Sequence, residues 1–364
     1  MKRFLFLNLL CIGILHLVTA QNAIKEQAFL KDYEGTINGK LPVKMHLVNW
    51  GGGNLSGNYL YKKVGKKIDI YGEFISDNAF NIKEYVGDKH TGTFEGAFEG
   101  TDKIKGTWSD PRGIKKFPFE VSLVKGVTDN SGWTGNWYLN DIWDSGTLLI
   151  GNVRKDSLDF AISVFRAGHI GEVEGPAARK GNQSSFSQRI NDIDDAGKCT
   201  INFTLKGSAI EIEQVSSGWD CGFGMRAHAS GKFDNKKIEL KPKISYGADQ
   251  IFVNKAQHDG FLALVGQKMY ELFAFNMQGF EKQEQEAGEG FKATVVVGAA
   301  YGLFMTNEAI VLYDGRGKYW AATLDFVGDQ GLVRYFSNDA TFKKKLPPTV
   351  EHWRERFPEY EVSF

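Results

Sequence analysis

The chain of 364 residues has few cysteines, few prolines and no net charge. It contains 3 cysteines and 8 prolines, and its 44 basic residues balance its 44 acidic residues. Scarce proline beside 42 glycines and 13% aromatic residues is typical of antiparallel sheets with tight glycine turns, and it argues against a disordered chain. A net charge of zero argues against a nucleic-acid partner and against long-range attraction to charged surfaces.

Signatures of hydrolases and nucleotide-binding proteins are also missing. The sequence has no G-x-S-x-G, H-E-x-x-H, Walker A or G-x-G-x-x-G pattern. Gly51–Gly53 lies between predicted strands with no helix after it, which indicates a hairpin tip rather than a phosphate cradle. Asp192, Asp194 and Asp195 resemble the start of a calcium loop, but Phe203 stands where a bidentate glutamate is required. We therefore predict no catalytic residues, no metal site and no cofactor.

The N-terminus has the pattern of an export signal. Lys2 and Arg3 precede the mostly apolar run Phe4–Val18, and Ala20 completes a small-residue cleavage site. The run is too short to span a bilayer comfortably. We predict that residues 1–20 are a signal peptide and that the mature protein is exported to the periplasm or the extracellular space and does not span a membrane.

Removal of that segment would also remove Cys11 and leave Cys199 and Cys221. Two cysteines in an exported chain indicate one disulfide, with a pair of buried free thiols as the alternative. A bond to Cys221 would make the surrounding turn rigid and hold Trp219 and Phe223 in fixed places. A preordered aromatic loop suits binding because it loses less entropy on association. The alternative is that both aromatic side chains plug the end of a barrel.

Short apolar runs alternate with glycine turns between residues 29 and 124. Period-2 alternation at roughly 10-residue intervals is typical of a meander, a sandwich or a small barrel. The predicted strands are Thr36–Leu41, Val43–Val48, Asn58–Val64, Lys67–Phe74, Ala79–Val86, Gly92–Phe98, Lys103–Trp108 and Phe117–Val124.

A second β module follows a linker-like segment at Lys125–Gly132. The two modules are alike in style, and a duplication is one explanation for that. The predicted strands are Gly135–Leu139, Gly146–Val153, Ser157–Phe165, Gly168–Ala178, Ser184–Ile190, Lys198–Leu205, Ala209–Val215 and Met225–Lys232. We place the first module at 21–126 and the second, barrel-like and with the disulfide, at 127–245.

The hydrophobic period changes in the last part of the chain, which we place at 246–364. Helical spacing relates six apolar residues: Phe261, Val265, Met269, Leu272, Phe273 and Met277. We predict a helix over Gly260–Gln278, with Asp259 as its N-cap and Gly279 just beyond its end. After the helix we expect a polar loop at Glu281–Glu289, strands at Phe291–Gly298, Glu308–Tyr313, Lys318–Leu324 and Leu332–Phe336, and a helix at Thr349–Phe357. The fold class is therefore mainly β: two small antiparallel barrels or meanders, then an α+β domain with a helix-flanked antiparallel sheet.

Five segments of this last part resemble bacterial inhibitors of vertebrate lysozyme, a family of exported proteins. The likeness covers about 100 of the 364 residues. It implies a small antiparallel sheet flanked by helices, and a protein partner. The segments are Phe275–Gly279, Val297–Tyr301, Asn307–Asp314, Trp320–Leu324 and Phe336–Asp339.

The sequence departs from that family at the inhibitory loop. The family has a disulfide-closed loop containing a histidine, of pattern C-K-P-H-D-C, before the strand that corresponds to Glu308–Tyr313. Here that place is Gly302–Asn307, which contains neither cysteine nor histidine. The inhibitory side chains therefore do not carry over. Two alternatives remain for this segment: a contact loop through Leu303, Phe304 and Met305, or a buried strand.

These patterns favour an exported, non-catalytic binding protein whose partner is a lysozyme-like enzyme or another protein. Arg316 and Lys318, at a hairpin tip, offer bases suited to the acidic cleft of a lysozyme. The first alternative is a lipid or a glycan held by one of the barrels. The second is a cell-wall glycan hydrolase using Glu172 and Glu174, which share one face of a strand about 7 Å apart.

Overall fold

The structure is a computed structural model of the whole chain, and it describes residues 23–124, 129–166, 168–190, 195–288, 291–328 and 330–364. The chain divides into two compact units, Met1–Val124 and Lys125–Phe364. The predicted fold class is confirmed, because two closed antiparallel barrels precede a six-stranded sheet with helices. The finer boundary between residues 245 and 246 stays a prediction. The predicted signal peptide lies outside the described residues.

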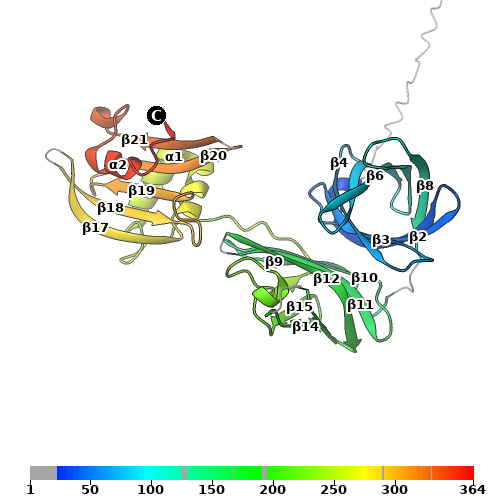
Figure 1. Cartoon of the computed structure of the whole chain (residues 1–364). Coiled ribbons are helices and arrows are strands. Elements are labelled where there is room, and N and C mark those ends of the chain that lie inside the picture. Colours follow the sequence, from blue (N-terminus) through cyan, green and yellow to red (C-terminus); the bar gives the residue numbers. More distant parts are fainter. Residues whose placement is uncertain (1–22, 125–128, 167, 191–194, 289–290, 329) are drawn as a thin grey trace, which may run out of the picture. The chain divides into compact units, whose positions relative to one another are not determined.

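The first barrel is an up-and-down meander in which each strand pairs with the next and β8 closes on β1. Figure 1 shows it as a ring of strands. Alternate side chains point inward, so aromatic rings fill the centre, and Phe98 contacts the rings of Phe29, Tyr33, Phe74 and Phe80. The strands are β1 (Phe29–Ile37), β2 (Leu41–Asn49), β3 (Asn54–Tyr61), β4 (Lys67–Phe74), β5 (Ala79–Val86), β6 (Lys89–Glu99), β7 (Lys103–Ser109) and β8 (Lys116–Leu123).

One predicted strand of this barrel is wrong. Thr36–Leu41 is not a strand, because Asn38 and Gly39 have φ of 55° and 64° and turn the chain between β1 and β2. Ile37 pairs with Leu41, so the turn holds three residues, and asparagine and glycine tolerate the positive φ of its first two positions. Gly51–Gly53 lies in the connection between β2 and β3, in agreement with the predicted hairpin tip.

The second barrel repeats the same topology, with β16 closing on β9. Its interior is also aromatic, and Phe160 contacts both Phe186 and Phe203. The strands are β9 (Gly135–Asn140), β10 (Ser145–Gly151), β11 (Ser157–Arg166), β12 (His169–Lys180), β13 (Gln183–Gln188), β14 (Cys199–Lys206), β15 (Ala209–Gln214) and β16 (Gly231–Asp234). The prediction for the last strand was wrong at its start: Met225 is exposed and Arg226 has a φ of 64°, so the strand begins only at Gly231.

The C-terminal sheet has two apolar faces, each covered by one helix (Figure 1). Helix α1 (Lys255–Asn276) packs on the face that carries Val311, and α2 (Pro348–Arg354) packs on the face that carries Leu312. Five strands are antiparallel in sequence order, and the last joins the edge in parallel. They are β17 (Gly279–Gly288), β18 (Phe291–Ala299), β19 (Glu308–Tyr313), β20 (Tyr319–Val327), β21 (Gln330–Ser337) and β22 (Glu361–Ser363).

Helix α1 differs from its prediction in two ways. It starts one turn earlier, because Asn254 rather than Asp259 is the N-cap and accepts a hydrogen bond from the Gln257 backbone N–H. It is also interrupted at Gly266, which has a φ of 74°. The interruption shifts the buried face, so Tyr270 is buried where regular spacing had placed Met269.

The predicted polar loop at Glu281–Glu289 is also wrong, because most of that segment belongs to β17. β17 is an edge strand, and charged side chains suit an edge because they discourage pairing with another chain. Over the described part of the chain, none of the helices is both long and apolar enough to cross a membrane.

Candidate functional site

The turn between β18 and β19 presents apolar side chains at the surface of the C-terminal domain. Tyr301 is 53% exposed, Phe304 is 66% exposed and Met305 is 52% exposed, while Leu303 is partly buried. Of the two alternatives for this segment, the structure shows an exposed turn and not a buried strand. Residues Tyr301–Asn307 are called the contact loop below.

Backbone hydrogen bonds close the contact loop on itself. The Asn307 N–H donates to the Leu303 carbonyl at 2.9 Å, and the Ala300 N–H donates to the Asn307 carbonyl at 2.9 Å. The Thr306 hydroxyl donates to the same Leu303 carbonyl at 3.0 Å. The segment is therefore a compact turn with internal bonding, which lowers the entropy that it would lose on binding.

An ion pair between a buried carboxylate and a partly exposed guanidinium group fixes the C-terminal end of the contact loop. Glu308 is 3% exposed, and its Oε1 accepts from the Met305 backbone N–H at 2.9 Å and from Nη2 of Arg356 at 2.8 Å. Met305 has a φ of 72°, a conformation that costs a non-glycine residue about 1 kcal/mol or more. The carboxylate of Glu308 thus holds Met305 in a strained conformation that exposes its side chain.

A buried side-chain amide also holds the contact loop. Asn276, at the end of α1, is fully buried and donates to the Thr323 hydroxyl and to the Leu324 carbonyl, both at 2.9 Å. Its Oδ1 accepts from Nδ2 of Asn307 at 3.2 Å. The contact loop is therefore tied at both ends to the sheet and to α1.

A hollow of about 400 Å³ lies beside the loop. Phe304 forms one wall, and Phe280 on β17 and Val297 on β18 contribute apolar surface. Glu308 and Arg356 also line it, and the Arg356 side chain keeps 43% of its surface exposed. The geometry combines a protruding apolar tip with an adjacent recess that contains one accessible guanidinium group.

The basic hairpin tip, the second predicted contact, is engaged in internal pairs. The Arg316 side chain is 83% exposed, and its Nε donates to Asp314 at 3.2 Å. Nζ of Lys318 donates to Asp339 at 3.2 Å. Asp314 also accepts the backbone N–H groups of Arg316 and Lys318, which fixes the turn. Since both bases are paired with carboxylates, the tip presents less free positive charge than its sequence indicates.

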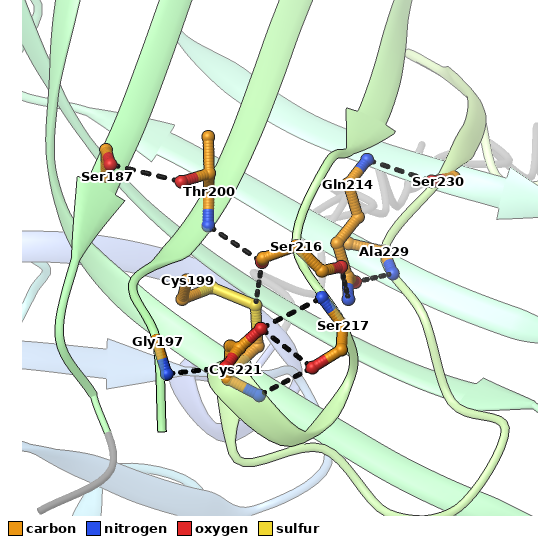
Figure 2. Close-up of a disulfide and its surroundings, with 11 residues drawn as sticks. Ser187, Gly197, Cys199, Thr200, Gln214, Ser216, Ser217, Cys221, Ala229 and Ser230 are labelled. Carbon is orange, nitrogen blue, oxygen red and sulfur yellow. Dashed lines mark hydrogen bonds between the residues drawn. A yellow bond between two sulfur atoms is a disulfide. The ribbon is translucent and has the colours of Figure 1, made fainter. Parts of the chain in front are cut away.

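The predicted disulfide between Cys199 and Cys221 is confirmed, and both residues are fully buried. Figure 2 shows hydrogen bonds around it that fix the turn Ser216–Gly222. The Ser217 hydroxyl and the Gly197 backbone N–H donate to Asp220, and these bonds lower the pKa of that carboxyl.

The two aromatic residues of this turn have different environments. Phe223 is 7% exposed and belongs to the core of the second barrel, where its ring lies against Gly171. Trp219 is 57% exposed. Phe223 is therefore an end plug, as one alternative predicts, while Trp219 stays at the surface.

The remaining candidates do not assemble into a reaction centre within the described residues. Glu172 and Glu174 lie on the outward side of β12, and Glu172 accepts from the Ser163 hydroxyl at 2.9 Å. Asp192 and Asp194 lie outside the described residues. Elsewhere in the described chain, no three His, Cys, Asp or Glu side chains come together in a way that could hold a metal ion.

Sequence reasoning missed Glu308 and Arg356, which support the contact loop. They are 48 residues apart, so no local pattern connects them, and only the packed sheet brings them together. No family model matches the chain, and neither a curated protein nor a solved structure matches it.

Proposed function

We propose that this chain is an exported, non-catalytic binding protein whose C-terminal domain docks on a protein partner through the contact loop. The observation that carries the proposal is the exposure of Phe304 and Met305 on a turn held at both ends. Binding energy at protein interfaces concentrates in a few aromatic and arginine residues. Methionine is common at adaptable binding surfaces because its side chain is flexible and polarisable.

The exposed guanidinium group in the recess beside the loop favours an acidic partner. Arg356 lies at the recess and remains partly exposed although Glu308 holds one side of it. A carboxylate of the partner that enters the recess would form a charge-assisted hydrogen bond with this guanidinium group. A lysozyme-like enzyme, with an acidic cleft, is the partner class that this chemistry and the family resemblance support together.

The barrel interiors give less support to the alternative of an enclosed lipid or glycan. Fully buried aromatic side chains occupy the centre of each barrel, including Tyr59 and Phe98 in the first and Phe160 and Phe203 in the second. A carrier of a small molecule needs an internal volume of several hundred cubic ångströms. Side chains of the barrels themselves already occupy the central positions.

The test is a turnover assay and calorimetry with vertebrate lysozymes, using the mature protein and a doubly substituted variant, Phe304→Ser with Met305→Ser. We expect the native protein to bind, and we expect the variant to bind at least about 100-fold more weakly, since two hot-spot side chains are lost. The matched control is Phe326→Ser with Val327→Ser, which removes two exposed apolar side chains elsewhere on the same domain. Equal binding by the loop variant, or the same loss in the control, would contradict the loop assignment. No binding to any lysozyme would remove that partner class.

A further inference from the structure

One end of the first barrel contains a buried carboxylate among aromatic side chains. Glu84 on β5 points inward and is 4% exposed. Tyr61 on β3, Trp108 on β7 and Phe117 on β8 are partly buried and pack against the same core from the ends of their strands. These four residues are called the barrel mouth below.

The described hydrogen bonds to Glu84 all reach the same oxygen. Oε2 accepts from the Tyr59 hydroxyl and from Nε1–H of Trp108, the latter at 3.0 Å. Among the described residues, no donor is hydrogen-bonded to Oε1, and no Lys, Arg or His side chain forms an ion pair with Glu84. The residue as a whole keeps 4% of its surface exposed. A buried carboxylate without a counter-charge is costly, and such groups are usually paired or coordinated.

The strand opposite Glu84 is shaped around this carboxylate. Gly92 is its partner on β6, and a Cβ added there would lie 2.7 Å from Oε1 of Glu84 and 2.5 Å from Nε1 of Trp108. Any larger residue would displace these groups. Thr91, next in the strand, is the extra residue of a bulge, and its hydroxyl is buried without a partner. Bulges are frequent beside functional sites because they redirect side chains.

The aromatic neighbours add a second feature that favours a cation. Trp108 stacks on Phe117 with 5.8 Å between ring centroids, and Tyr61 packs edge-on against Tyr59. Aromatic faces attract organic cations, with tryptophan the strongest, and the attraction grows when water is excluded.

We propose that the barrel mouth binds an organic ammonium group, which would give Oε1 of Glu84 its missing donor and counter-charge while its alkyl part lies against Trp108 and Tyr61. This site is independent of the contact loop. The ammonium chemistry is shared by a free alkylamine and by a lysine side chain of a peptide, and the test separates these two sources.

The experiment follows the Trp108 indole N–H by NMR in the full chain, with the resonance assigned from its loss in Trp108→Phe. The probes are n-butylammonium, the peptide Gly-Lys-Gly with blocked termini, and n-pentanol as a neutral control. We expect saturable shifts with one or both cations and none with the alcohol. In Glu84→Gln, whose amide oxygen still accepts from Tyr59 and Trp108, we expect affinity to fall by about tenfold or more. The matched control is Glu95→Gln, an exposed glutamate on β6, which is expected to bind as the native protein does.

Saturation by the amine shows a small-molecule site, and saturation by the peptide alone assigns the site to lysine side chains of a protein. The proposal is overturned if neither cation shifts the resonance in a saturable way, if the alcohol binds equally well, or if Glu84→Gln keeps the native affinity.

Discussion

Two glutamates are buried among the residues whose burial the structure describes, Glu84 in the first barrel and Glu308 in the C-terminal domain, and their hydrogen-bonding partners differ. Both are less than 5% exposed. Glu308 faces the guanidinium of Arg356 and a backbone N–H, so its charge is balanced inside the domain. Within the described part of the chain, the donors to Glu84 are the neutral groups of Tyr59 and Trp108. The difference indicates that Glu308 serves the architecture of the contact loop, whereas the partner of the second Glu84 oxygen is the ammonium group that we propose for the barrel mouth.

Among the substitutions that test this difference, we expect the largest effect on stability at Glu308. Glu308→Ala removes the acceptor of Met305 and the partner of Arg356, and we expect a loss of about 1–3 kcal/mol in the free energy of unfolding. Because Arg356 is 43% exposed, water compensates part of the lost pairing and keeps the value below that of a fully buried pair. Urea unfolding of the C-terminal domain measures the loss, and hydrogen exchange of residues 302–306 should become faster. The control Glu355→Ala, on an exposed glutamate, should change little. An unchanged exchange rate would show that the ion pair does not fix the loop.

A second effect, of about 2 kcal/mol, is expected at Asp32, a buried carboxylate of the first barrel that does have a cationic partner, Lys44. Burial by itself would raise the pKa of Asp32, but hydrogen bonds from His46 and Lys44 outweigh it and lower the pKa to about 2. A depressed pKa stabilises the fold above the unfolded-state pKa of about 4, and this contribution is lost as the pH falls toward 2.

The test is urea unfolding between pH 6 and about pH 2, with the Trp108 indole resonance as the probe of the first barrel. We expect Asp32→Asn to be less stable than the native protein near neutral pH and to lose less stability on acidification. Parallel pH profiles for the two proteins would contradict the role of this carboxylate.

The smallest effect is expected at Glu84. Glu84→Gln keeps an acceptor for Tyr59 and Trp108 and removes a charge that no cation of the described residues balances. The change in the free energy of unfolding should stay within about 1 kcal/mol and can be favourable. The same unfolding experiment at neutral pH measures it. A loss as large as that of Asp32→Asn would mean that Glu84 is a structural group and would weaken the contrast with Glu308.

The barrels were largely predictable because inward and outward residues alternate along each strand. β4 and β5 have the predicted bounds, and the disulfide followed from the two cysteines that remain beyond the predicted signal peptide. Misplaced elements have local causes: a positive φ at Asn38 and Gly39 ended β1, and Gly266 shifted the buried face of α1. The edge strand β17 was predicted to be a loop because polar residues are common in loops and also in edge strands.

The candidate site was only partly predictable. The exposed tip at Phe304 and Met305 matches the contact loop that the family resemblance suggested, for which a buried strand was the alternative. The supporting pair of Glu308 and Arg356 and the buried amide of Asn276 depend on tertiary contacts between distant segments, which leave no periodic signal. The same holds for the barrel mouth, where Glu84 and Trp108 are 24 residues apart.

The most direct test of the binding account is a hydrogen-exchange footprint of the mature protein with and without an excess of a vertebrate lysozyme. The account predicts that protection concentrates in the contact loop and around Arg356, while Asp314–Lys318 and the barrel strands exchange as before. Protection centred on Asp314–Lys318 or on Trp219, with none in the contact loop, would contradict it.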